Sequence, residues 1–148
     1  MVIVRRTRAG RRSAPATLAL DEALLALFIH AMDANGHVSP RELERAHHLI
    51  WFTRRFRRKS GDTVARMIDA VRTMIDEHGP PAVMKAAIAA IPARLAAPAF
   101  AVLADLLLAD GHLDALDWQF LRSTGTSLKL DQPAQRRILD VTLVKNQL

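Results

Sequence analysis

Four carboxylates at two glycine-containing turns could bind a divalent cation. Asp110, Asp114 and Asp117 follow one another closely around Gly111, and Glu42 has an equivalent place in an earlier, related segment. Carboxylate oxygens are the ligands that Ca²⁺ and Mg²⁺ prefer in proteins. The spacing therefore predicts a candidate cation site formed by Asp110, Asp114 and Asp117 together with Glu42. Ca²⁺ or Mg²⁺ is favoured over Zn²⁺ as the bound ion.

Two more specific metal sites fit this segment less well. An EF-hand loop with Gly36 or Gly111 at its sixth position would have alanine or leucine where the first ligand must be, so an EF-hand is rejected. His37 and His112 could add nitrogen ligands for Zn²⁺, but each stands alone in its turn and no histidine belongs to an HxxxH pair. Zinc is therefore the less favoured metal.

Helix capping explains the same carboxylates without any ligand. Gly111 follows an apolar segment, where a glycine can end a helix at little steric cost. Ser39 and Asp114 are good N-cap residues, and Glu42 and Asp117 stand three positions later, which is the spacing of a capping box. Capping is the favoured interpretation of these residues, and cation binding is the alternative.

The two turns belong to an internal repeat. A shift of 75 positions, without a gap, aligns residues 30–43 with residues 105–118. The aligned residues are identical or similar in type, as in the match of Ala34-Asn35-Gly36-His37-Val38-Ser39 with Ala109-Asp110-Gly111-His112-Leu113-Asp114. Such self-similarity predicts two related helical hairpins.

An apolar helix that ends in Ala-Asp-Gly and is followed by a capped second helix, twice in one helical chain, resembles the TerB family of tellurite-resistance and stress proteins. It is also similar to the TerB-like domain of DnaJ-type co-chaperones. The second copy matches best, from Ile91-Pro92 to Leu128-Lys129-Leu130, and the first departs from the pattern at Asn35.

The resemblance implies a compact bundle of about seven helices with two pseudo-twofold-related hairpins. It further implies a non-enzymatic protein that binds a metal ion or acts as a scaffold, with protein partners in a tellurite or other stress-response complex associated with a membrane. No catalytic activity comes with this resemblance.

Two polar residues interrupt apolar helical segments. Asp105 lies within Phe100 to Leu108, and its repeat counterpart His30 also lies in an apolar segment. A buried charge needs a partner, so such residues collect at functional sites. A structural explanation is favoured for both: a hydrogen bond to a neighbouring helix end, a bond to each other, or a position facing solvent.

Positive charge is concentrated in two segments that contain no acidic residue. The chain has 21 Lys and Arg and 15 Asp and Glu, for a net charge of +6. Ten of the cations are in the two segments. The rest of the chain therefore has 11 cations and all 15 acidic residues, for a formal charge of −4. The segments are an N-terminal arm with Arg5, Arg6, Arg8, Arg11 and Arg12, and a basic patch with Arg54, Arg55, Arg57, Arg58 and Lys59.

The basic patch has a functional and a structural interpretation. Residues 5–12 and 54–59 could bind nucleic acid or anionic lipid, with Trp51 stacking or inserting at an interface. Alternatively, the cations complement the dipole at the C-terminal end of a helix, and the aromatic residues anchor the core. Binding through these basic segments is the alternative to the TerB-like function. An anionic membrane surface is the more favoured partner and nucleic acid the less favoured one.

The segments that contain these residues are all expected to be helical. Apolar residues recur at helical spacing and strand-like alternation is missing, so the sequence predicts an all-α protein. One helix should follow Asp62 as its N-cap and end at His78-Gly79-Pro80-Pro81, and the others should span 16–34, 40–59, 81–91, 95–110, 115–126 and 132–146. The helices at 16–34 and 95–110 are apolar on nearly all sides and should form the centre of the bundle. Residues 1–15 form the basic arm and residues 16–148 the TerB-like domain.

The sequence also narrows the class of protein. The chain of 148 residues has no cysteine, no GxGxxG or Walker pattern, and no activated nucleophile among the Ser and Thr residues around Gly125. No charge-free segment approaches the roughly 20 apolar residues of a membrane-spanning helix. These features predict a non-enzymatic protein of the cytoplasm, peripheral to the inner membrane if it acts there. The composition, rich in Ala and Arg throughout, favours a bacterial protein.

Overall fold

The structure is a computed structural model of the chain, and it describes Pro15 and residues 17–33, 47–48, 50–51, 53–108 and 111–147. All regular secondary structure within these ranges is helical, and none of it is strand. The prediction of an all-α helical bundle is therefore confirmed. Six helices have defined bounds: α1 Leu20–Asp33, α3 Gly61–His78, α4 Pro80–Ala90, α5 Ala93–Leu107, α6 Ala115–Ser127 and α7 Gln132–Lys145.

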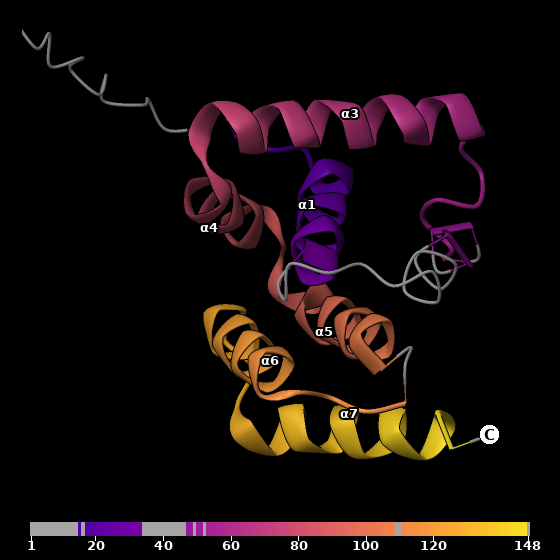
Figure 1. Ribbon diagram of the computed structural model, residues 1–148, viewed down its shortest axis with the longest axis vertical. Helices are drawn as coiled ribbons and strands as arrows, with labels where there is room; N and C mark the ends of the chain where they lie inside the picture. Colours follow the sequence, from indigo (N-terminus) through magenta and orange to yellow (C-terminus); the bar gives the residue numbers. More distant parts are fainter. Residues whose placement is uncertain are drawn as a thin grey trace, which may run out of the picture.

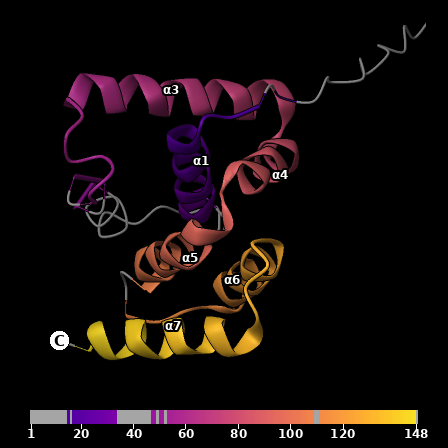
Figure 2. The ribbon, with the colours of Figure 1, turned by 180° about the vertical axis from the view of Figure 1, so that it is seen from behind.

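Helices α1 and α5 occupy the middle of the molecule. Figure 1 shows α3 and α7 at opposite ends of the long axis, with α1 and α5 between them, and the view from behind in Figure 2 agrees. Helix α1 contacts α3, α4 and α5, whereas α5 also contacts α6 and α7. Every residue of α1 from Ala23 to Ile29 is buried, as are Phe100 and Leu103 to Leu107 of α5. The two helices without a polar face are thus central, as their composition predicts.

The N-terminal end of α3 differs from the sequence prediction. Ser60, not Asp62, is the N-cap, and its hydroxyl oxygen accepts a hydrogen bond of 3.2 Å from the backbone N–H of Thr63. Asp62 lies in the first turn instead, where its negative charge interacts favourably with the positive end of the helix dipole. The predicted end of this helix is confirmed: Gly79 has a φ of 85° and separates α3 from α4.

The predicted helix over 40–59 is wrong in its C-terminal part. Residues 53–59 form successive turns, with hydrogen bonds from the N–H groups of Phe56 and Arg57 to the carbonyl oxygen of Thr53, at 3.1 and 3.0 Å. Phe56 is only 1% exposed and anchors the turns to the core. A helix here would place like charges three and four positions apart, as with Arg54 and Arg58, which destabilises helices.

Two predicted features cannot be compared with the structure. The first copy of the repeat, including Asn35, Gly36 and the Ser39–Glu42 capping box, lies outside the described residues, as does the basic arm. The seventh helix and the pseudo-twofold arrangement therefore stay predictions. Within the described residues, no helix has the length and apolar character needed to cross a membrane.

Candidate functional site

The second glycine turn forms a complete capping box. Asp114 Oδ1 accepts a hydrogen bond of 2.8 Å from the N–H of Asp117, and Asp117 Oδ2 accepts one of 3.0 Å from the N–H of Asp114. Gly111 has a φ of 86°, a conformation that favours glycine. Folding thus accounts for one carboxylate oxygen of Asp114 and one of Asp117.

The structure brings together two of the four carboxylates of the candidate cation site. Asp114 and Asp117 are joined in the capping box, while Asp110 and Glu42 lie outside the described residues. In the part of the chain that the structure describes, no group of three or more His, Asp or Glu side chains is placed to hold a metal ion. Binding of Ca²⁺, Mg²⁺ or Zn²⁺ at this turn stays a prediction.

Asp105 and its repeat counterpart His30 have separate environments. Asp105 is buried and forms an ion pair with Lys145 and a 3.0 Å hydrogen bond from Asn146 Nδ2, so it ties α5 to the C-terminal end of α7. The imidazole of His30 packs on the ring of Phe120 in α6, with the two centroids 5.5 Å apart. It lines a pocket of about 430 Å³ between α1, α4 and α6.

The burial of His30 predicts a pH-dependent stability. Burial lowers the pKa of His30 below its ordinary value of 6.5, although the nearby Asp33 carboxylate opposes this. The unfolded chain therefore takes up a proton near pH 6.5 that the folded chain takes up only at lower pH, so stability falls as the pH falls through 6.5. Urea denaturation between about pH 8 and about pH 5.5 should show this slope, and His30→Gln should reduce it. An unchanged slope in His30→Gln, or an equal reduction in the exposed His112→Gln control, would contradict this assignment.

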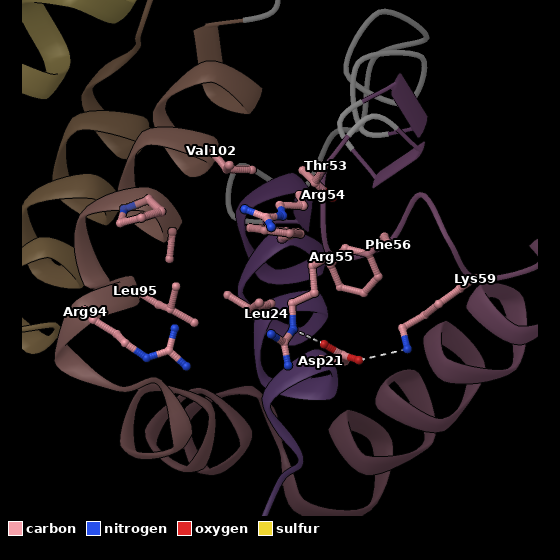
Figure 3. A pocket seen from close by; sticks show the side chains of 13 residues that line it. Asp21, Leu24, Thr53, Arg54, Arg55, Phe56, Lys59, Arg94, Leu95 and Val102 are labelled. Carbon is pink, nitrogen blue, oxygen red and sulfur yellow. Dashed lines mark hydrogen bonds and ion pairs between the residues drawn. The ribbon is translucent and has the colours of Figure 1, made fainter.

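A pocket with a positively charged rim lies between α1, α5 and the turns at 53–59. Its volume is about 710 Å³. Arg54, Arg55 and Lys59 come from the turns, and Arg94 comes from the first turn of α5. Figure 3 shows Arg94 on one side of this space and Arg54 and Arg55 on the other. We call this feature the basic pocket.

Apolar side chains form most of the rest of the wall. Leu24 and Phe28 contribute from α1, Ala99 and Val102 from α5, and Phe56 from the turns. Leu24, Phe28, Phe56 and Ala99 are each less than a tenth exposed, so they belong to the core and hold the wall in place. The pocket therefore combines an apolar interior with a cationic rim.

Asp21 is the acidic residue that lines the basic pocket. Its carboxylate accepts a hydrogen bond from Arg55 Nε, and Lys59 Nζ lies 3.0 Å from its other oxygen. Burial raises the pKa of Asp21, but the hydrogen bonds and charges of Lys59 and Arg55 outweigh burial and hold the pKa below its ordinary value. Asp21 is therefore ionised at neutral pH and fixes two of the four cations on the rim.

The basic pocket only partly coincides with the basic patch predicted from the sequence. Arg54, Arg55 and Lys59 line it, whereas Arg57 and Arg58 are exposed beside it. Arg94 and Asp21 belong to the pocket but were not singled out by the sequence, because each is distant along the chain and surrounded by residues of ordinary helix composition. Only the packing of α1 against α5 reveals them.

Comparisons with known proteins do not assign a family. The chain matches no family model, no curated protein and no solved structure.

Proposed function

We propose that this protein is a non-enzymatic binding module that attaches to anionic lipid surfaces through the basic pocket. The observation that carries the proposal is the pocket itself: four cations and one carboxylate surround an interior built from core side chains. Arg57 and Arg58 are exposed beside it and add to the positive field. Clusters of Lys and Arg of this size attract anionic lipid by about 1 kcal/mol for each cation near the surface.

An anionic lipid fits this arrangement better than a nucleic acid. Phosphates of either partner would satisfy the cations, but only a lipid also supplies an apolar part for the interior of the pocket. Proteins that bind single strands stack successive bases on several accessible aromatic rings, whereas the two rings in the wall of the pocket, Phe28 and Phe56, are only 5% and 1% exposed. Trp51 precedes the turns and is 41% exposed, and tryptophan is enriched at the interface between lipid and water.

The resemblance to the TerB family supports the same setting and extends the proposal. It favours a role at the cytoplasmic face of a membrane, with protein partners in a tellurite or other stress response and two pseudo-twofold helical hairpins. Divalent-cation binding is not part of this proposal, because Asp114 and Asp117 each use a carboxylate oxygen in the capping box. It stays a separate prediction that calorimetry with Ca²⁺, Mg²⁺ and Zn²⁺ would test.

Co-sedimentation with vesicles tests the proposal. We expect the protein to bind vesicles of phosphatidylglycerol, to bind vesicles of phosphatidylcholine little, and to be released from the former as salt screens the charges. Equal binding to both vesicles, or binding that is insensitive to salt, would contradict it. Tighter binding to duplex DNA than to phosphatidylglycerol at the same salt concentration would also contradict it and favour a nucleic-acid partner.

A further inference from the structure

The interior of the basic pocket is larger and more apolar than contact with lipid headgroups requires. Its volume of about 710 Å³ lies within the range of about 300–1,000 Å³ that is usual for small-molecule sites. Leu95 and Val102 are half-buried and Pro98 is exposed, so these side chains of α5 present apolar surface to the pocket. A hydrated ion or a headgroup alone would leave these apolar side chains in contact with water, so they fit a ligand that has an apolar part.

The rim offers two cations to an incoming negative charge. Asp21 pairs with Arg55 and Lys59, whereas Arg54 and Arg94 have no carboxylate partner among the described residues. Figure 3 shows these two arginines entering the pocket from different elements, the turns and α5. With four cations and one carboxylate, the lining carries a formal charge of +3. A single anionic head is therefore attracted chiefly to Arg54 and Arg94.

We propose that the basic pocket holds one acyl chain of an anionic amphiphile, with the chain against Leu95, Pro98 and Val102 and the head between Arg54 and Arg94. This inference rests on the proposed function and deepens it, because it replaces adhesion to a charged surface by capture of a single molecule. The shared chemistry is an acyl chain with a negative head, whose source is either a free fatty acid or a membrane phospholipid. Asp21 limits the affinity, since its carboxylate offsets the charges of Arg55 and Lys59 and repels the anionic head.

Calorimetry with a series of monomeric fatty acids tests the inference on the full chain. We expect no measurable binding of acetate, and an affinity that rises from octanoate to dodecanoate by at most about fourfold for each buried methylene group. Dodecanol, with the same chain and no charge, should bind at least about tenfold more weakly, since it lacks the charge-assisted hydrogen bonds of a carboxylate. Comparison of tetradecanoate with the lysophosphatidylglycerol of the same chain identifies the source, and tight binding of either one supports the proposal.

Two variants test the placement of the chain and of the head. Val102→Glu puts a charge on the pocket wall and should abolish the dependence of affinity on chain length, whereas Val141→Glu, at a position on α7 that is 70% exposed, should leave it unchanged. Asp21→Asn removes the negative charge from the rim and should raise the affinity for dodecanoate by about fivefold, and an unchanged affinity would overturn the placement of the head.

The results that would overturn the inference differ from those that would overturn the proposed function. Equal affinities for acetate and dodecanoate, or no binding of any monomeric amphiphile, would remove the acyl-chain site while leaving salt-sensitive vesicle binding intact. An unaltered chain-length dependence in a folded Val102→Glu protein would likewise overturn it. Equal binding to phosphatidylglycerol and phosphatidylcholine vesicles, in contrast, would remove the proposed function itself.

Discussion

Reversal of two charges on the rim, in the double variant Arg54→Glu/Arg94→Glu, is expected to weaken binding to phosphatidylglycerol vesicles by about 100-fold or more. The two guanidinium groups have no carboxylate partner among the described residues, so they are the rim cations most available to lipid phosphates. Both side chains are exposed, and the change should leave the fold intact. Vesicle co-sedimentation at constant salt measures the effect, and circular dichroism checks the helical content.

A matched variant separates the pocket from net charge. Arg66→Glu/Arg137→Glu alters the charge of the chain by the same amount, at exposed positions on α3 and α7 that do not line the basic pocket. We expect this variant to lose less than about tenfold in vesicle affinity, because its charges lie away from the pocket. Equal losses in the two double variants would mean that overall charge, and not the pocket, attracts the lipid.

Replacement of Gly125 by alanine is expected to lower the free energy of unfolding by about 3 kcal/mol. A Cβ atom at this position would lie 2.6 Å from both Cδ and Oε1 of Gln135 and 2.9 Å from Cε2 of Phe100. Phe100 is fully buried, and Gln135 is held by a 2.9 Å hydrogen bond from its Nε2 to the carbonyl oxygen of Leu130. Gln135 can swing aside only by giving up that hydrogen bond, and the enclosed ring of Phe100 has no room to move, so the added methyl group pushes α6 away from α5.

Urea denaturation of three proteins tests this prediction about Gly125. The neighbouring Thr126→Ala changes an exposed residue of the same helix and should alter stability by less than about 0.5 kcal/mol. The double variant Gly125→Ala/Gln135→Ala removes one of the two clashing side chains and should recover part of the loss. If Gly125→Ala were as stable as the unaltered protein, the close approach of α5, α6 and α7 described here would be wrong.

The elements that depend on local chemistry were predictable from the sequence. Continuous apolar residues identify α1 and α5 as central, because a helix without a polar face must be enclosed. The spacing of Asp114 and Asp117 predicts their capping box, since both hydrogen bonds of the box span three residues. Gly79 between two predicted helices likewise identifies a turn that needs a positive φ.

The basic pocket was only partly predictable, because it depends on contacts between distant segments. The run of cations from Arg54 to Lys59 identifies a charged surface, but helical periodicity predicts the wrong backbone for it. The turns observed there follow from the burial of Phe56 and from the pairing of Arg55 and Lys59 with Asp21, which lies more than thirty positions earlier. Arg94 joins them only through the packing of α5 against α1.

The contact between the basic pocket and lipid can be measured directly, since the chain has no cysteine and a single introduced one can be labelled uniquely. A fluorophore that reports polarity would be attached at Thr53→Cys, in the wall of the pocket, and separately at Gln119→Cys, at an exposed position on α6. We expect a blue shift of the Thr53→Cys emission with phosphatidylglycerol vesicles, no such shift with phosphatidylcholine, and no shift at Gln119→Cys. Equal shifts at the two sites, or a shift at Gln119→Cys alone, would contradict it.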